Sequence, residues 1–254
     1  FYCSETTSTA FEIAIDYLVL HALDSDWDTP PELEASWAKI RGHEFTKAGF
    51  SGAAWDLHAR TVDKPLASVL GGTRAEVVTG VSLGIEPTID DLLTQVQHQV
   101  DAGYRRVKLK ITPGWDVEPV AAVRAAYPDL DLHVDANGAY PDDDASAKVF
   151  TTLDGAGLIM IEQPYAPRDF LAHARLQSRI GTPVCLDESV VDIHDLHTML
   201  ALEAGRVLNI KISRMGGLTA ARAAHDVAVD AGIPVWCGGM HEFGVGRAAN
   251  VAIS

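Results

Sequence analysis

The chain has 254 residues, 47% of them hydrophobic, which is enough for one large α/β domain or for a barrel with an appended region. Its formal net charge of −15 argues against a nucleic acid or an anionic membrane as partner, because both are bound by basic surfaces. The cysteines, Cys3, Cys185 and Cys237, are far apart, which indicates neither a disulfide framework nor a zinc cluster. We expect a cytoplasmic protein that acts on a small molecule.

Residues 1–76 are predicted to be mainly helical. Segments 5–23 and 45–62 repeat apolar residues with helical periodicity, and segment 28–40 begins with a Thr-Pro helix-entry signal. The chain opens on Phe1 rather than on methionine and stops inside an apparent helix, so we expect it to be cut at both ends.

From residue 77 onward, short β-rich segments alternate with amphipathic ones. The predicted strands are 77–85, 106–111, 130–136, 157–163, 182–188, 206–212 and 233–239. Each connecting segment is long enough to be the crossover helix of a parallel βαβ unit. Such an alternation forms either a barrel or an open doubly wound sheet. The strand period of about 25 residues favours an α/β fold with a TIM-like (β/α)7β barrel over residues 77–254, its last strand not included. No glycine-rich phosphate loop follows the first strand, so nucleotide binding is not predicted.

Charged and polar residues close one predicted strand after another. They are Lys108, Lys110, Asp135, Asn137, Glu162, Asp187, Glu188, Lys211 and Ser213. A single K-x-K pair is more often a solvated strand edge, and Asp135 or Asp187 alone could cap a helix. Recurrence at a nearly constant interval instead indicates one ring at the carboxyl ends of the strands, where barrels carry their chemistry.

The residue types in this ring indicate a metal-assisted proton transfer. Carboxylates on three consecutive strands would repel one another unless a cation joined them, and ligation by oxygen alone suits Mg²⁺ or Mn²⁺. Lysines on either side of a bound substrate could remove and return a proton if burial and a nearby cation lower their pKa.

Several motifs resemble the enolase superfamily, in its muconate lactonizing subgroup, over nearly the whole chain. They are "KLK", "VDAN", "IEQP", "LDES", "NIKISRMGG" and "WCGGM". The resemblance implies a barrel closed by an α+β capping domain, of which residues 1–76 would be a partial remnant with connecting helices.

The resemblance also implies a role for each matching position. The expected metal ligands are Asp135, Glu162 and Asp187. The expected catalytic lysines are Lys110, its partner on the opposite face Lys211, and the assisting Lys108. The expected substrate contacts are Ser82, Asn137, Gly239 and Met240. Glu188 is either a group supporting the ligands or a helix cap, and Arg214 either tunes the pKa of Lys211 or pairs with a surface carboxylate.

The activity implied by the resemblance is removal of a proton α to a substrate carboxylate, giving a metal-stabilised enediolate. Within the subgroup the motifs are most similar to those of enzymes that form o-succinylbenzoate by dehydration, a lyase reaction of menaquinone biosynthesis, or that racemise N-acylamino acids such as N-succinylamino acids. A muconate cycloisomerase or another racemase or epimerase of the subgroup is the alternative, and a non-catalytic metal-binding barrel is the alternative of another class. A small carboxylate substrate and a homo-oligomer are expected.

Overall fold

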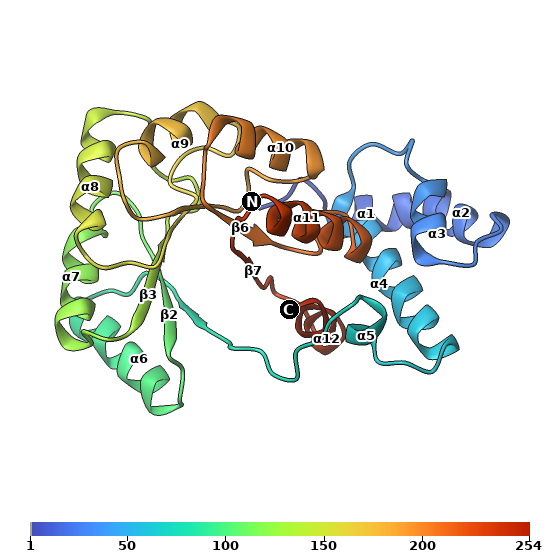
Figure 1. Cartoon of the computed structure of the whole chain (residues 1–254), viewed down its shortest axis with the longest axis horizontal. Coiled ribbons are helices and arrows are strands. Elements are labelled where there is room, and N and C mark those ends of the chain that lie inside the picture. The colour runs from blue at the N-terminus through green and yellow to red at the C-terminus, as the bar shows by residue number, and fades with distance from the viewer. Residues whose placement is uncertain (1) are drawn as a thin grey trace. The chain divides into compact units, whose positions relative to one another are not determined.

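The computed structural model describes residues 2–254 and divides into two compact units (Figure 1). Among the described residues, the first unit consists of 2–77, 191–196 and 209–254, and the second of 78–190 and 197–208. The domain boundary expected between residues 76 and 77 stays a prediction, although one boundary between the units lies one residue away.

A parallel sheet with seven strands in sequence order is the centre of the fold. Its strands are β1 (Val81–Leu83), β2 (Arg106–Lys110), β3 (Asp131–Asp135), β4 (Ile161–Glu162), β5 (Val184–Leu186), β6 (Val207–Ile210) and β7 (Val235–Cys237). Each falls within one of the segments predicted from the sequence. The parallel sheet and its connecting helices confirm the predicted α/β fold. The sequential strand order excludes the open doubly wound alternative, because such a sheet reverses its strand order part-way.

Crossover helices connect the strands. They are α6 (Ile89–Asp101), α7 (Val117–Ala126), α8 (Asp144–Asp154), α9 (Phe170–Gln177), α10 (Ile193–Leu202) and α11 (Leu218–Asp230). Several begin at a side chain that accepts a hydrogen bond from a free backbone N–H of the first turn, as Thr88 does for α6 and Asp143 for α8. In the second unit, α6, α7 and α8 follow one another along β2 and β3 (Figure 1).

The N-terminal region, as far as residues 2–76 are described, contains helices and no strand. These helices are α1 (Thr7–Ile13), the π-helical η1 (Ala14–Leu18), α2 (Val19–Asp24), α3 (Pro30–Ser36), α4 (Glu44–Thr61) and α5 (Leu66–Val69), and α12 (Gly244–Ile253) ends the chain. The Thr-Pro entry signal is confirmed, because Thr29 and Glu32 form a capping box at the start of α3. The single helix predicted over 5–23 is instead interrupted by the π-helical turn of η1.

The orientation of β2 is determined by its apolar residues. Val107 and Leu109 are almost fully buried, whereas Lys108 and Lys110 are only partly buried on the opposite face. Burying each apolar side chain contributes about 1.5–3 kcal/mol, and a slip of one residue would exchange the two faces. The apolar pair therefore directs both lysines to the same side of the strand, as the alternation in the sequence predicts.

Candidate active site

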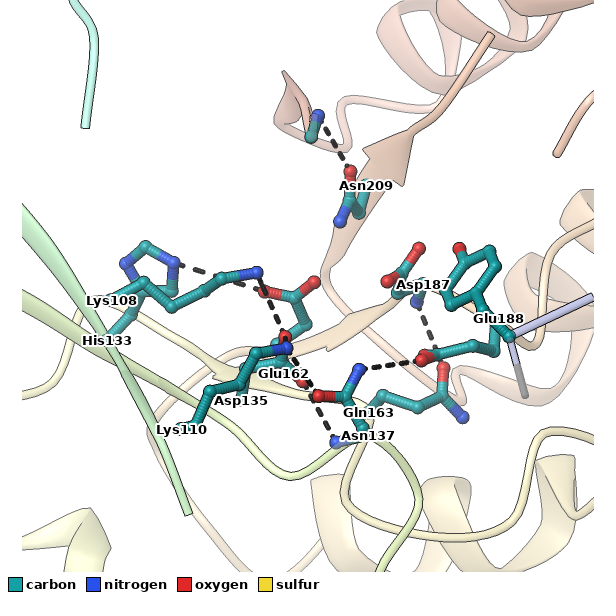
Figure 2. A network of polar contacts seen from close by, with 12 residues as sticks. Lys108, Lys110, His133, Asp135, Asn137, Glu162, Gln163, Asp187, Glu188 and Asn209 are labelled. Carbon is teal, nitrogen blue, oxygen red and sulfur yellow. Dashed lines mark hydrogen bonds and ion pairs between the residues drawn. The ribbon is translucent and has the colours of Figure 1, made fainter. Parts of the chain in front are cut away.

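The register of the sheet places charged residues side by side at the carboxyl ends of the strands. Lys110 of β2 is paired with Asp135 of β3, and Asp135 is paired in turn with Glu162 of β4. Asp187 directly follows β5, the next strand. The expected clustering of these strand ends is therefore present in the second unit, as Figure 2 shows.

Both lysines of β2 are held by the same carboxylate. The Nζ atom of Lys108 lies 2.9 Å from Oδ2 of Asp135 and 3.2 Å from Oε2 of Glu162, and Nζ of Lys110 lies 2.6 Å from Oδ2 of Asp135. The side chain of Lys108 is 11% exposed and that of Lys110 is 31% exposed. A solvated strand edge, the simpler reading of the K-x-K pair, is therefore wrong.

The protonation states at this corner follow from burial and charge. Burial alone would lower the pKa of Lys108, but the Glu162 and Asp135 carboxylates outweigh it and the net pKa is raised. Burial alone would raise the pKa of Asp135, but the Lys108 and Lys110 ammonium groups outweigh it and the net pKa is lowered. Lys108 therefore stays positively charged, which fits the assisting role expected for it.

Asn137, which follows β3, links this corner to the loop after β5. Its Oδ1 accepts a hydrogen bond from Nζ of Lys110, and its Nδ2 donates to Oε1 of Glu188 at 2.8 Å (Figure 2). Its own backbone N–H donates to Oδ1 of Asp135 at 2.9 Å, and its φ of 44° is in the left-handed region. Asn137 is thus held between two charged groups of the candidate site.

Glu188 faces the site. Burial, followed by the negative charge of Asp187, raises the pKa of Glu188. The helix-capping alternative for Asp187 and Glu188 is not supported, because Asp192 caps the start of α10. Oδ1 of Asp192 accepts hydrogen bonds from the backbone N–H groups of His194 and Asp195.

Sequence reasoning missed three buried polar residues of the second unit. His133 pairs with Lys108 in the register of β2 and β3, and burial, reinforced by the Lys108 ammonium, lowers the pKa of His133 to about 3. Gln163 and His173 are also fully buried and share a hydrogen-bond network. The available signal was Gln163 itself, a polar residue beside Glu162 at the end of an apolar segment.

Lys211 and Arg214 belong to the first unit, where both are buried. Nζ of Lys211 lies over the ring of Tyr2, 4.5 Å from its centroid, and Nη1 of Arg214 donates to the Tyr2 hydroxyl at 2.9 Å. Nη2 of Arg214 donates to the carbonyl of Asn209. Because Arg214 is 4% exposed, a surface ion pair is not its role, while its effect on Lys211 stays a prediction.

The remaining expected contacts lie on strand ends and loops. Ser82 of β1 is exposed and paired in register with Lys108. In the first unit, the backbone N–H of Gly238 donates to Oδ1 of Asn209 at 2.9 Å, and a Cβ atom at this position would collide with Asn209, so only glycine fits there. The following Gly239 and Met240 lead to Glu242, whose Oε1 accepts from the Met240 N–H.

Comparison with known proteins gives the family. Residues 91–254 match the family described as enolase C-terminal domain-like. The chain belongs to this family. It is 47% identical over 253 residues to an o-succinylbenzoate synthase of Geobacillus kaustophilus and 45% identical over 254 residues to an N-succinylamino acid racemase of Amycolatopsis sp.. All of this chain is covered, and it spans 67% and 68% of the length of those two relatives.

Solved structures place the chain in the enolase superfamily as well. A crystal structure of a superfamily member from Enterococcus faecalis V583 aligns with a TM-score of 0.94 and 42% sequence identity, covering 99% of this chain and 68% of that one. Over residues 2–254, the structure has no helix that is both long and apolar enough to cross a membrane.

The three expected metal ligands of this enolase-superfamily chain differ from a preformed metal site in arrangement but agree with it in donor chemistry. Among residues 2–254, no three His, Cys, Asp or Glu side chains are gathered closely enough to hold a metal ion. Lys108 instead lies against two of the three expected ligands. The donor chemistry nevertheless fits a hard divalent cation, since Asp135, Glu162 and Asp187 are all at most 1% exposed and offer oxygen only.

His173 is expected to make the stability of the second unit depend on pH. Burial lowers the pKa of His173 to about 4, whereas an unfolded chain would have a value of about 6.5. Between these pH values the unfolded chain binds more protons, so the free energy of unfolding falls as the pH is lowered from 6.5 to 4, by up to about 3 kcal/mol from this group.

Urea unfolding at pH 7, 5.5 and 4.5 measures this effect. His173→Gln is expected to be less stable than the wild type at pH 7 but to lose less stability on acidification. His98→Gln, at an exposed position of α6, is the control and should follow the wild type. An unchanged pH dependence in His173→Gln would show that His173 is not the group that titrates.

Proposed function

We propose that the protein catalyses Mg²⁺-dependent removal of a proton α to a substrate carboxylate, with o-succinylbenzoate synthesis as its main reaction and N-succinylamino acid racemisation as a second activity. The observation that carries the proposal is the contact of two lysines of one strand with a buried carboxylate, beside a second carboxylate on the next strand. Superfamily members combine such a lysine base with bound Mg²⁺.

Asp135, Glu162 and Asp187 are the groups proposed to hold the metal. They lie at the ends of three neighbouring strands, are at most 1% exposed, and offer only oxygen as donor atoms. Bound Mg²⁺ would neutralise these carboxylates and stabilise the negative charge that develops on the substrate carboxylate. Mn²⁺ has the same ligand preference and serves as a spectroscopic substitute.

Lys110 is proposed to be the base that takes the α-proton. Of the two lysines of β2 it is the more exposed, so its Nζ atom is the more accessible to a substrate. In the dehydration, the α-C–H bond breaks, the proton moves to Nζ of Lys110, and the protonated lysine then assists loss of hydroxide as water. Lys108, with its raised pKa, stays charged and stabilises the anionic intermediate.

Lys211 is proposed to serve the opposite face of the substrate. In the dehydration it acts as a fixed cation, whereas racemisation requires it to exchange a proton. Ser82, Asn137, Gly239 and Met240 are proposed to contact a small carboxylate substrate. The second activity is included because relatives of both names match the whole chain at similar identity.

Steady-state assays of the full chain on a panel of carboxylates test this function. We expect o-succinylbenzoate formation and racemisation of an N-succinylamino acid, both lost with a chelator and restored by Mg²⁺. Preference for muconate or for dipeptides would favour the alternatives within the subgroup. Absence of any metal-dependent exchange of an α-proton would favour the non-catalytic barrel.

A further inference from the structure

The side chain of Gln163 is the centre of a buried polar network at the end of β4. Gln163 directly follows Glu162, is 0% exposed and has a φ of 41°, a left-handed value that is sparsely populated for residues other than glycine. Every hydrogen-bonding atom of its carboxamide has a partner within the second unit.

The carbonyl end of this carboxamide holds the loop after β5. Oε1 of Gln163 accepts hydrogen bonds from the backbone N–H groups of Asp187 at 3.0 Å and Ser189 at 3.2 Å, and Figure 2 shows the contact with Asp187. The residue between them is Glu188. The side chain that directly follows β4 therefore holds the loop backbone at both ends of the Asp187–Glu188 pair.

The amide end determines which way the carboxamide is turned. Nε2 of Gln163 donates to Oγ of Ser189 at 2.7 Å and to the carbonyl of Tyr165 at 3.0 Å. A flipped carboxamide would place its NH₂ group against two backbone N–H groups and its oxygen against a carbonyl, so only the observed orientation satisfies all partners.

His173 completes the network in a defined tautomer. Its Nε2 accepts a hydrogen bond from the backbone N–H of Tyr165 at 3.2 Å, so its Nδ1 carries the proton and donates to the carbonyl of Asp169 at 2.7 Å. Nε2 of Gln163 lies 3.4 Å from the same Nε2 atom. His173 thereby holds the backbone segment whose carbonyl receives the Gln163 amide.

We propose that Gln163 is a positioning residue that fixes Asp187 and Glu188 for binding of a divalent cation, with Ser189 and His173 supporting its carboxamide. This inference rests on the proposed function, because it assigns a purpose to the same site. Gln163 is not itself one of the proposed ligands, and it would act through the backbone of the loop that carries Asp187. Groups that orient metal ligands in this way typically change metal affinity by about 10- to 100-fold.

Gln177 provides a matched control in the same unit. It is a buried glutamine at the end of α9, its Oε1 accepts from the backbone N–H of Val184 at 2.7 Å, and its Nε2 donates to the carbonyls of Ile180 and Thr182. Both glutamines thus hold the backbone of the β5 region, Gln177 at the amino end and Gln163 at the carboxyl end. Only Gln163 lies beside the acidic residues Asp187 and Glu188.

The experiment compares Gln163→Met with Gln177→Met by Mn²⁺ titration, read by electron paramagnetic resonance, and by thermal unfolding without metal. Both substitutions remove buried hydrogen bonds, so both are expected to lower the melting temperature. Gln163→Met alone is expected to weaken Mn²⁺ binding, by about 10-fold or more, while Gln177→Met stays within about twofold of the wild type. Ser189→Ala, which removes a single hydroxyl, should weaken Mn²⁺ binding less than Gln163→Met does. If Gln163→Met does not fold, the Mn²⁺ affinity of Ser189→Ala tests the positioning role in its place.

The possible outcomes are distinct. Equal Mn²⁺ affinity in the wild type, Gln163→Met and Ser189→Ala would overturn the positioning role and leave the metal site intact. Equal loss of affinity in Gln163→Met and Gln177→Met would show a general effect of destabilisation and would also overturn it. If the wild type itself does not bind Mn²⁺, the proposed metal site fails, and the inference fails with it.

Discussion

Replacing Asp135 with asparagine is expected to reduce metal-dependent turnover by at least about 1,000-fold. The physical reason is that Asp135 has two roles: it is a proposed metal ligand, and it is the carboxylate that both lysines of β2 contact. The neutral amide keeps the shape of the side chain and removes its charge, so the loss should appear in Mn²⁺ affinity as well as in turnover.

The same substitution should lower the stability of the second unit. Removing one partner of a buried ion pair commonly costs about 3–5 kcal/mol, and the lower end is expected here because Lys110 is partly exposed. Asp131→Asn is the matched control: it lies on the same strand, at the exposed amino end. The measurements are turnover, Mn²⁺ titration and urea unfolding of both variants. Full turnover of Asp135→Asn in the presence of Mg²⁺ would refute the assigned roles.

Replacing Lys110 or Lys211 with alanine is expected to separate the two faces of the substrate. If each face has its own base, Lys110→Ala should block α-proton exchange for one enantiomer of an N-succinylamino acid, and Lys211→Ala should block it for the other. Lys110→Ala should also abolish o-succinylbenzoate formation, because that reaction begins with removal of the α-proton. Loss of a general base typically costs about 100- to 10,000-fold, so each effect should be large.

Deuterium incorporation followed by proton NMR measures each exchange directly. Lys148→Ala, at an exposed position of α8, is the control and should leave both exchanges unchanged. Equal residual exchange of both enantiomers in both lysine variants would show that the faces are not divided between these residues. The design requires no assumption about the natural substrate.

Much of the candidate site could be predicted from the sequence, because the patterns that indicate it lie within single strands. Strand residues alternate between two faces, so an apolar pair such as Val107 and Leu109 already indicates that Lys108 and Lys110 share the other face. Ionisable residues that close successive apolar segments likewise indicate neighbouring points at one edge of a parallel sheet. These arguments need only the periodicity of the chain, and the structure bears them out in the row formed by Lys110, Asp135 and Glu162.

The protonation state of Lys108 could not be predicted from the spacing of residues in the sequence. Sequence spacing places the lysine near carboxylates but gives no distances, and the sign of a pKa shift depends on whether burial or the paired charges have the larger effect. In the structure the two carboxylates are close enough to outweigh burial, and the shift is upward.

The sequence by itself determined the α/β class, the positions of the seven strands and the identity of the charged residues at their ends, because all three depend on patterns within single segments of the chain. Only the tertiary structure decided which carboxylate the lysines share, that Arg214 is buried beside Tyr2, and that Gln163 holds the loop of Asp187. Those contacts join residues from separate segments of the chain, and their geometry depends on packing and register that no local pattern contains.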